Sequence, residues 1–191
     1  MNLPVFHSEQ FAVFPVLETA RLLLRETGEK DLPGIFRLYA DERIMRYRGA
    51  PTFSSVEEAE HLLQHWSGLF SGTNGIRWTI TQKENDRLIG TAGFNRFMKE
   101  HFRGEIGYEL DPQLWNKGIM TEALRAIAGW GFTKAGLHSI EANIAPDNLA
   151  SKRVLEKLDF AQEAHYRENY YYKGWWDSVI YSLRANEFRN M

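Results

Sequence analysis

The chain has 191 residues, of which 43% are hydrophobic and 14% are aromatic. This is enough for one domain with a full core and argues against a predominantly disordered chain. A net charge of −2 gives no strong attraction to nucleic acid or to an anionic membrane, so we expect neither as a direct partner. The absence of cysteine excludes disulfides, thiolate metal sites and a cysteine nucleophile.

The N-terminal residues do not have the pattern of a targeting segment. Residues 1–7 contain no basic stretch followed by a long apolar run. No apolar run in the chain approaches the roughly 20 residues of a membrane helix. We therefore expect a cytoplasmic protein. We also expect residues 1–16 to be a loose leader and residues 17–188 to form a single domain.

The first third of this domain predicts one strand and two helices. The apolar run at residues 21–25 predicts the strand. Apolar residues at helical spacing predict a helix over residues 29–40. A second helix is predicted from Ser54 or Ser55 to about Leu69, because acidic residues occupy its first turn.

The rest of the chain alternates between strands and helices. A polar turn between two apolar runs predicts a hairpin, and glycines mark further turns. The predicted strands lie at residues 77–82, 88–94, 103–110, 139–144, 162–172 and 175–184, and the predicted helices at residues 121–134 and 148–158. Together these elements predict an α+β fold (α/β three-layer), in which helices flank a mixed, mostly antiparallel sheet.

The turn before the helix at residues 121–134 is a candidate anion site. Gly118 allows backbone conformations that a side chain would forbid. The free N–H groups of the first helical turn attract phosphate. The spacing of a Walker A loop is missing, and so is the Gly-x-Gly-x-x-Gly fingerprint of dinucleotide enzymes. A plain strand–helix connection has the same local pattern, so the turn alone does not define a ligand.

Four segments together resemble the GNAT N-acetyltransferase superfamily, and within it the branch of ribosomal-protein N-terminal acetyltransferases. Their spacing also matches, and the resemblance covers nearly the whole chain. It implies a GNAT-like sheet in which two central parallel strands are splayed. The matching segments are an opening strand at 17–25, a central strand at 105–110, a loop at 115–123, and a second cofactor helix with its end at 148–151 and 155–160.

The chain departs from the superfamily pattern at a few positions. Trp115 stands where Gln or Arg is usual, Asn116 where a further Gly is common, and Met120 where Gly or Ala is common. The loop acts mainly through backbone N–H groups, so we still expect it to bind. Asp159 replaces a usual Gly after the second helix, and Asp tolerates the left-handed conformation better than most residues.

The resemblance implies acetyl-CoA (coenzyme A) as a cosubstrate and no metal. The pantetheine would lie between the strands at 105–110 and 139–144, and the diphosphate would bind the N–H groups of residues 116–121. Lys117 would add positive charge there or remain a solvated lysine. The implied cofactor-binding residues are Leu110, Trp115, Asn116, Lys117, Gly118, Ile119, Met120, Thr121, Asn148 and Ser151.

The implied reaction needs a neutral amine to attack a thioester. An α-amino group has a pKa near 8 and a lysine amine about 10.4, so a general base is useful. Glu109, at the C-terminal end of the central strand, is the first candidate, and Glu105 is the second because it shares that strand face. Ser151 matches the hydroxyl that protonates the leaving thiolate in this branch. The alternatives are paired or solvent-facing carboxylates, and a Ser151 that only caps its helix behind Asn148.

The acceptor amine is not defined by the sequence. Tyr170 stands where related enzymes place a glutamate, with Glu168 close by. The aromatic residues around Tyr170 would line an acceptor cleft or only pack between strands. The resemblance favours a protein N-terminal α-amino group as acceptor and a monomer or homodimer. A polyamine or antibiotic acetyltransferase is the alternative that a strongly acidic cleft would favour, and a non-catalytic acyl-CoA-binding protein is the third.

Overall fold

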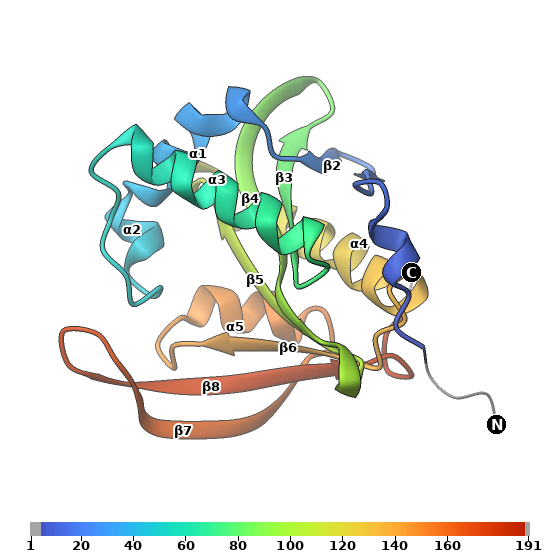
Figure 1. The fold of residues 1–191 in the computed structure, drawn as a ribbon. Helices are drawn as coiled ribbons and strands as arrows, with labels where there is room; N and C mark the ends of the chain where they lie inside the picture. The colour runs from blue at the N-terminus through green and yellow to red at the C-terminus, as the bar shows by residue number, and fades with distance from the viewer. Residues whose placement is uncertain (1–4, 190–191) are drawn as a thin grey trace.

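The computed structural model describes residues 5–189 of the chain. Within them, eight strands form one sheet in the order β1-β2-β3-β4-β5-β6-β8-β7 (Figure 1). The strands are β1 (Leu17–Glu18), β2 (Leu22–Glu26), β3 (Ile76–Gln82), β4 (Asn85–Met98), β5 (Arg103–Leu110), β6 (Ser139–Ile144), β7 (Ala161–Tyr171) and β8 (Trp175–Arg184). The α-helices are α1 (Leu32–Tyr39), α2 (Glu42–Met45), α3 (Val56–Ser71), α4 (Ile119–Thr133) and α5 (Leu149–Glu156).

The sheet is mixed, as the sequence predicts. Neighbouring strands are antiparallel except for β5 and β6. These two parallel strands pair only from Arg103 to Glu105 on β5 and then diverge. β6 instead pairs with β8 along its whole length. The splayed central strands that the family resemblance implies are therefore confirmed, and the later residues of β5 have an edge without a strand partner (Figure 1).

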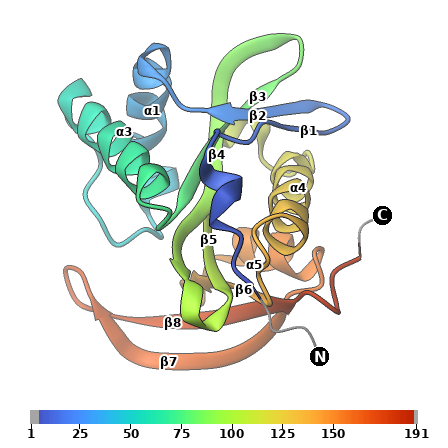
Figure 2. The same cartoon turned by 45° about the vertical axis from the view of Figure 1, so that its right-hand side comes forward.

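Helices cover both faces of the sheet and define two cores. α1 and α3 lie on one face and α4 on the other, with the strands between them (Figure 2). The larger core lies between α4 and the sheet and includes Trp78, Phe94 and Leu124. A smaller core joins Ile35 of α1 to Trp66 of α3. This three-layer arrangement confirms the predicted fold class.

The predicted helices and strands are confirmed with shifted ends. β4 extends from Asn85 to Met98, beyond the predicted 88–94, and α4 begins at Ile119 rather than at residue 121. The end of α5 has the expected left-handed residue: Asp159 has a φ of +63°, and the amide of Phe160 donates to the carbonyl of Leu155 at 3.1 Å. The two-residue β1 and the single turn of α2 carry too few residues for a periodic pattern.

The described part of the expected leader is packed rather than loose. Phe11 is 7% exposed, and its ring centroid lies 5.4 Å from that of Trp130. Phe14 contacts Phe70 at 4.9 Å between ring centroids. The carbonyl of Pro15 accepts a hydrogen bond from the indole of Trp78 at 2.7 Å. Aromatic side chains thus attach this segment to the larger core, although their spacing has no helical or strand period.

Truncation of Phe11 tests this attachment. We expect Phe11→Ala to lower the free energy of unfolding by about 3 kcal/mol, because it removes a buried aromatic ring. Val13→Ala is the matched control: Val13 is 79% exposed, so its truncation changes stability by less than about 0.5 kcal/mol. Urea denaturation of both variants measures the difference. Equal denaturation midpoints would contradict the packed position of residues 5–16.

Candidate active site

The loop that precedes α4, residues 115–118, turns through two left-handed residues. Asn116 has a φ of +61° and Gly118 a φ of +75°. The first helical hydrogen bond runs from the amide of Glu122 to the carbonyl of Gly118 at 3.0 Å. None of the backbone amides from Asn116 to Thr121 donates a hydrogen bond to another residue among those described. The helix N-terminus therefore presents free N–H groups, as the sequence predicts for an anion site.

Two polar side chains from the turn between β1 and β2 hold this loop in place. Arg21 donates to the carbonyl of Lys117 at 3.1 Å and forms an ion pair with Glu122 at 2.7 Å. Thr19 donates to the same carboxylate at 2.6 Å. Although partial burial acts to raise the pKa of Glu122, hydrogen bonds from Thr19 and Arg21 lower it overall. An ionised Glu122 in the first turn also suits the helix dipole.

A groove of about 390 Å³ runs from this loop along β5 to α5. Every implied cofactor-binding residue except Lys117 lines it. The indole of Trp115, which also lines the groove, donates to the carbonyl of Leu110 at 2.8 Å and is thereby held against the end of β5. Arg153 and Lys157 of the α5 region also line the groove, and the sequence analysis did not identify these cations as site residues.

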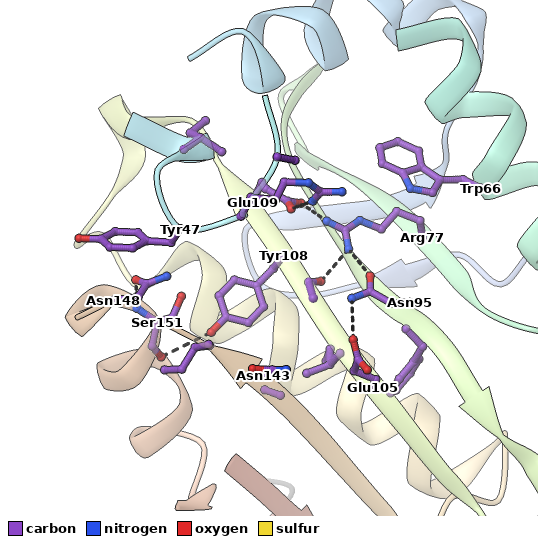
Figure 3. Close-up of a pocket in the computed structure, with 18 of the residues that line it drawn as sticks. Tyr47, Trp66, Arg77, Asn95, Glu105, Tyr108, Glu109, Asn143, Asn148 and Ser151 are labelled. Carbon is purple, nitrogen blue, oxygen red and sulfur yellow. Dashed lines mark hydrogen bonds and ion pairs between the residues drawn. The ribbon is translucent and has the colours of Figure 1, made fainter. Parts of the chain in front are cut away.

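A second cavity, of about 500 Å³, lies on the other side of β5. It is bounded by the segment after α2, by α3 and by the central strands. The cavity and the groove share six residues: Ile44, Tyr47, Tyr108, Glu109, Asn148 and Ser151. Figure 3 shows the last four of these side chains on neighbouring elements. We call this shared region the junction. Glu105 lies on the cavity side only.

Ser151 and Tyr108 are two of the three hydroxyl-bearing residues at the junction, and Tyr47 is the third. The side chain of Asn148 accepts a hydrogen bond from the amide of Ser151 at 3.1 Å, so the expected helix cap is present and leaves the Ser151 hydroxyl outside it. The phenol of Tyr108 donates to the carbonyl of Ser151 at 3.4 Å. Burial raises the pKa of Tyr108 to about 12. The sequence analysis missed Tyr108, because a tyrosine in a strand gives no signal of its own.

Glu109 is bound to two arginines. Its Oε2 atom pairs with Arg77 and accepts hydrogen bonds from Tyr39 at 3.0 Å and Thr91 at 3.2 Å. Its Oε1 atom pairs with Arg48. Arg77 is only 4% exposed, and this burial lowers its pKa to about 10. The position of Arg77 inside an apolar strand was a sequence signal, since a buried charge requires a partner.

Glu105 faces the same cavity as Glu109, as strand parity predicts (Figure 3). Its carboxylate pairs with Arg96 at 2.8 Å and accepts a hydrogen bond from Asn95 at 3.4 Å. Each of the two candidate bases therefore has a guanidinium partner. This pairing is the alternative that the sequence analysis left open for both residues.

Tyr170 is the aromatic residue of the C-terminal hairpin that lines the cavity. Its hydroxyl donates to the carbonyl of Gly49 at 2.8 Å. Tyr171 and Trp175 instead pack against each other at 5.2 Å between ring centroids, on an exposed part of the hairpin. Glu168 is exposed and has its amide bonded to Asp177 at 2.9 Å. The hairpin thus places one of its aromatic residues, not a cluster, beside the junction.

Two depressions that meet at one region, one of them ending on free helix amides, suit an enzyme that transfers a group between two substrates. Among residues 5–189 no three or more His, Asp or Glu side chains are grouped as metal ligands would be. In the same part of the chain, no helix combines the length and apolarity needed to span a membrane.

Comparison with known proteins identifies the family. Residues 21–161 match the acetyltransferase (GNAT) domain model. The chain is 37% identical over 172 residues to the N-acetyltransferase YoaA of Bacillus subtilis, covering 90% of this chain and 97% of that protein. It is 25% identical over 182 residues to the ribosomal protein uS5-alanine N-acetyltransferase of Escherichia coli, covering 90% and 92%. The chain therefore belongs to the GNAT family and is an acetyltransferase.

A solved structure supports the same fold. The ribosomal L7/L12 alpha-N-protein acetyltransferase RimL, in complex with coenzyme A, superposes with a TM-score of 0.82. The superposition covers 89% of this chain and 98% of RimL, at 21% sequence identity. At this level of identity the likeness establishes the fold alone.

Substitution of Gly118 tests the anion site. A Cβ at residue 118 would lie 3.6 Å from its nearest neighbour, Arg21, so space is available and the cost comes from the positive φ. We expect Gly118→Val to weaken acetyl-CoA binding at least roughly tenfold, because a branched residue disfavours this conformation by about 1–2 kcal/mol. Isothermal calorimetry measures the affinity.

Gly28→Val is the matched control, since Gly28 has extended backbone with a φ of −128° and open space around it. Its affinity for acetyl-CoA should equal that of the wild type. An unchanged affinity in a folded Gly118→Val protein would exclude the loop as the phosphate site.

Proposed function

We propose that this acetyltransferase moves the acetyl group of acetyl-CoA to a primary amine, and that the amine is a protein N-terminal α-amino group. The observation that carries the proposal is the meeting of the groove and the cavity at Tyr108, Glu109, Asn148 and Ser151. The groove would hold the donor and the cavity the acceptor. Distant likeness to the uS5-alanine enzyme supports the choice of an N-terminal amine.

The residues of the groove fit acetyl-CoA. The free amides of residues 116–121 suit a diphosphate, and Arg153 and Lys157 add positive charge along the groove. The unpaired edge of β5 offers backbone groups to the amides of pantetheine. The donor supplies a thioester carbonyl. The protein positions that carbonyl at the junction, within reach of the second cavity.

The transfer forms an N–C bond and breaks a C–S bond. The amine nitrogen loses one proton, and the departing thiolate gains one. We propose Ser151 as the proton donor, since its hydroxyl lies at the junction. Tyr108 is the second candidate: burial raises its pKa to about 12, so its phenol carries a proton at neutral pH.

The charge of the cavity favours an N-terminal amine over a polycation. A polyamine or aminoglycoside site needs carboxylates that are free to pair with the ligand. Glu109 already pairs with Arg48 and Arg77, and Glu105 pairs with Arg96. Because both carboxylates that line the cavity have these partners, a polycationic acceptor gains little electrostatic stabilisation there.

The general-base role expected for Glu109 stays a prediction. A carboxylate that holds two guanidinium groups is strongly favoured in its ionised form, and protonating it would leave Arg77 buried without a counter-ion. This geometry favours an anchoring role for Glu109. Glu105 faces the cavity with a single ion-pair partner that is itself exposed, so it is the less constrained of the two carboxylates.

A thiol-release assay tests the proposed acceptor. We expect acetyl-CoA turnover to be fastest with short peptides that have a free N-terminal alanine or serine. The matched control is the same peptide with a blocked N-terminus and one internal lysine, which should react at least about tenfold more slowly at neutral pH, because less of its amine is neutral. Faster turnover of spermidine or an aminoglycoside would support the small-molecule alternative. Acetyl-CoA binding without turnover of any amine would support the non-catalytic one.

Substitution of Ser151 tests the proton donor. We expect Ser151→Ala to lower kcat on the order of tenfold or more with an unchanged Kd for acetyl-CoA. The helix cap survives this change because Asn148 binds the backbone amide of Ser151. Ser151→Thr keeps a hydroxyl and should retain most of the activity. A normal kcat in Ser151→Ala, together with a low kcat in Tyr108→Phe, would transfer the role to the phenol.

A further inference from the structure

Three charged side chains that line the cavity carry an excess positive charge. Arg48 and Arg77 share the single carboxylate of Glu109, which leaves the group with a net charge of about +1. Figure 3 shows the side chain of Glu109 next to that of Arg77, and Tyr108 nearby on the same strand as Glu109. Arg48 and Arg77 line the cavity, and Glu109 lines both the cavity and the groove. The excess charge therefore lies next to the point where an acceptor would meet a thioester.

Arg48 is held in place by several independent contacts. Its guanidinium pairs with Oε1 of Glu109 and lies over the ring of Tyr39, 4.9 Å from the centroid. The following residue, Gly49, accepts the hydroxyl of Tyr170 at 2.8 Å. Gly49 has a φ of +63°, and a Cβ there would collide with the Tyr170 ring. These contacts come from three separate elements, so Arg48 forms a fixed charge although it is 38% exposed.

Neither of the two carboxylates that line the cavity is free to offset this charge. Oε2 of Glu109 already has three donors: Arg77, Tyr39 and Thr91. Glu105, the other carboxylate of the cavity, pairs with Arg96. An incoming ammonium group would meet two guanidiniums and a carboxylate that is already shared. Like charges at a few ångströms disfavour the charged form of the group that binds.

We propose that Arg48 makes the cavity selective for acceptors that bind as neutral amines, and that the site thereby favours α-amino groups over more basic amines. Glu109 serves as the anchor that fixes Arg48 and Arg77. No proton has to pass to a protein carboxylate, because the amine loses its proton to water as it enters. The inference rests on the proposed function and names the residue that selects the acceptor.

Other titratable groups face the same space and need to be separated from Arg48. They are His65 of α3, Tyr39 of α1, Tyr47 in the segment after α2, Tyr108 and Glu105 of β5, and Tyr170 of β7. Of these residue types, histidine is the one whose side chain can change charge between pH 5 and 8. A limb of the pH profile that belongs to His65 would be lost in His65→Gln, whereas one that belongs to the acceptor amine would persist.

The test is the pH dependence of kcat, which reports the ionisation of groups in the substrate complex. The acceptor is the peptide amine that reacts fastest in the thiol-release assay. Without the fixed cation, the bound amine keeps its proton to higher pH. We therefore expect the acidic limb of Arg48→Gln to lie higher than that of the wild type by on the order of one pH unit. The two profiles should converge at high pH, where the amine is neutral in both proteins.

Two variants serve as controls. Arg48→Lys keeps a positive charge and should have a limb close to that of the wild type. Arg46→Gln removes a nearby arginine that is exposed and lines neither the cavity nor the groove, so its profile should be unchanged. Circular dichroism verifies that each variant is folded.

A second measurement uses the wild type alone and needs no variant. Two peptides that differ only in a glycyl or a β-alanyl N-terminus present amines of lower and higher basicity. The acidic limb should follow the basicity of the amine, and the glycyl peptide should be preferred at neutral pH. Arg48→Gln should move the limbs of both peptides to higher pH by a similar amount.

Three outcomes would overturn the inference: a limb that does not move in Arg48→Gln, a limb that disappears in His65→Gln, or a limb that is the same for both peptides. Absence of turnover with every amine would instead contradict the proposed function itself, and this inference with it.

Discussion

The parting of β5 from β6 is the constraint on which the rest of the molecule depends. The two strands pair only up to Glu105, so the later backbone groups of β5 have no strand partner on that side. On its other edge, β6 stays paired with β8 from end to end. A buried, unpaired backbone group costs on the order of 1–3 kcal/mol. Such an edge persists where it borders open space, and here it borders both the groove and the cavity.

The helix that connects these two strands, α4, places its N-terminus beside the open edge of β5. α4 has to begin beside the end of β5, and the short connection requires left-handed turns at Asn116 and Gly118. The resulting helix N-terminus faces the groove. Arg21, in the turn between β1 and β2, then fixes the loop through Glu122 and the carbonyl of Lys117. A turn near the start of the chain thereby supports a loop almost a hundred residues later.

The parts of this structure that depend on local patterns can be predicted from the sequence. The strands, the long helices, Gly118 as a left-handed residue and the cap of Ser151 by Asn148 follow from periodicity and from turn or cap chemistry. Residues 8–16 could not be placed in this way, because Phe11 and Phe14 are fixed by contacts with distant rings. Arg48 gave no signal, since only the folded chain brings its loop to Glu109.

The two arginines that pair with Glu109 differ in burial, and this difference separates their proposed roles. Arg77 is buried on a central strand and retains its charge at neutral pH despite a pKa of about 10. Removing Glu109 would leave Arg77 as an uncompensated buried charge, so the charged form of Arg77 depends on Glu109. Arg48 is more exposed and comes from a connecting segment, where exchange of a side chain costs little stability. In the proposed reaction, the strands would therefore keep one donor site and one anchoring carboxylate, while the segment after α2 would set the charge that the acceptor meets.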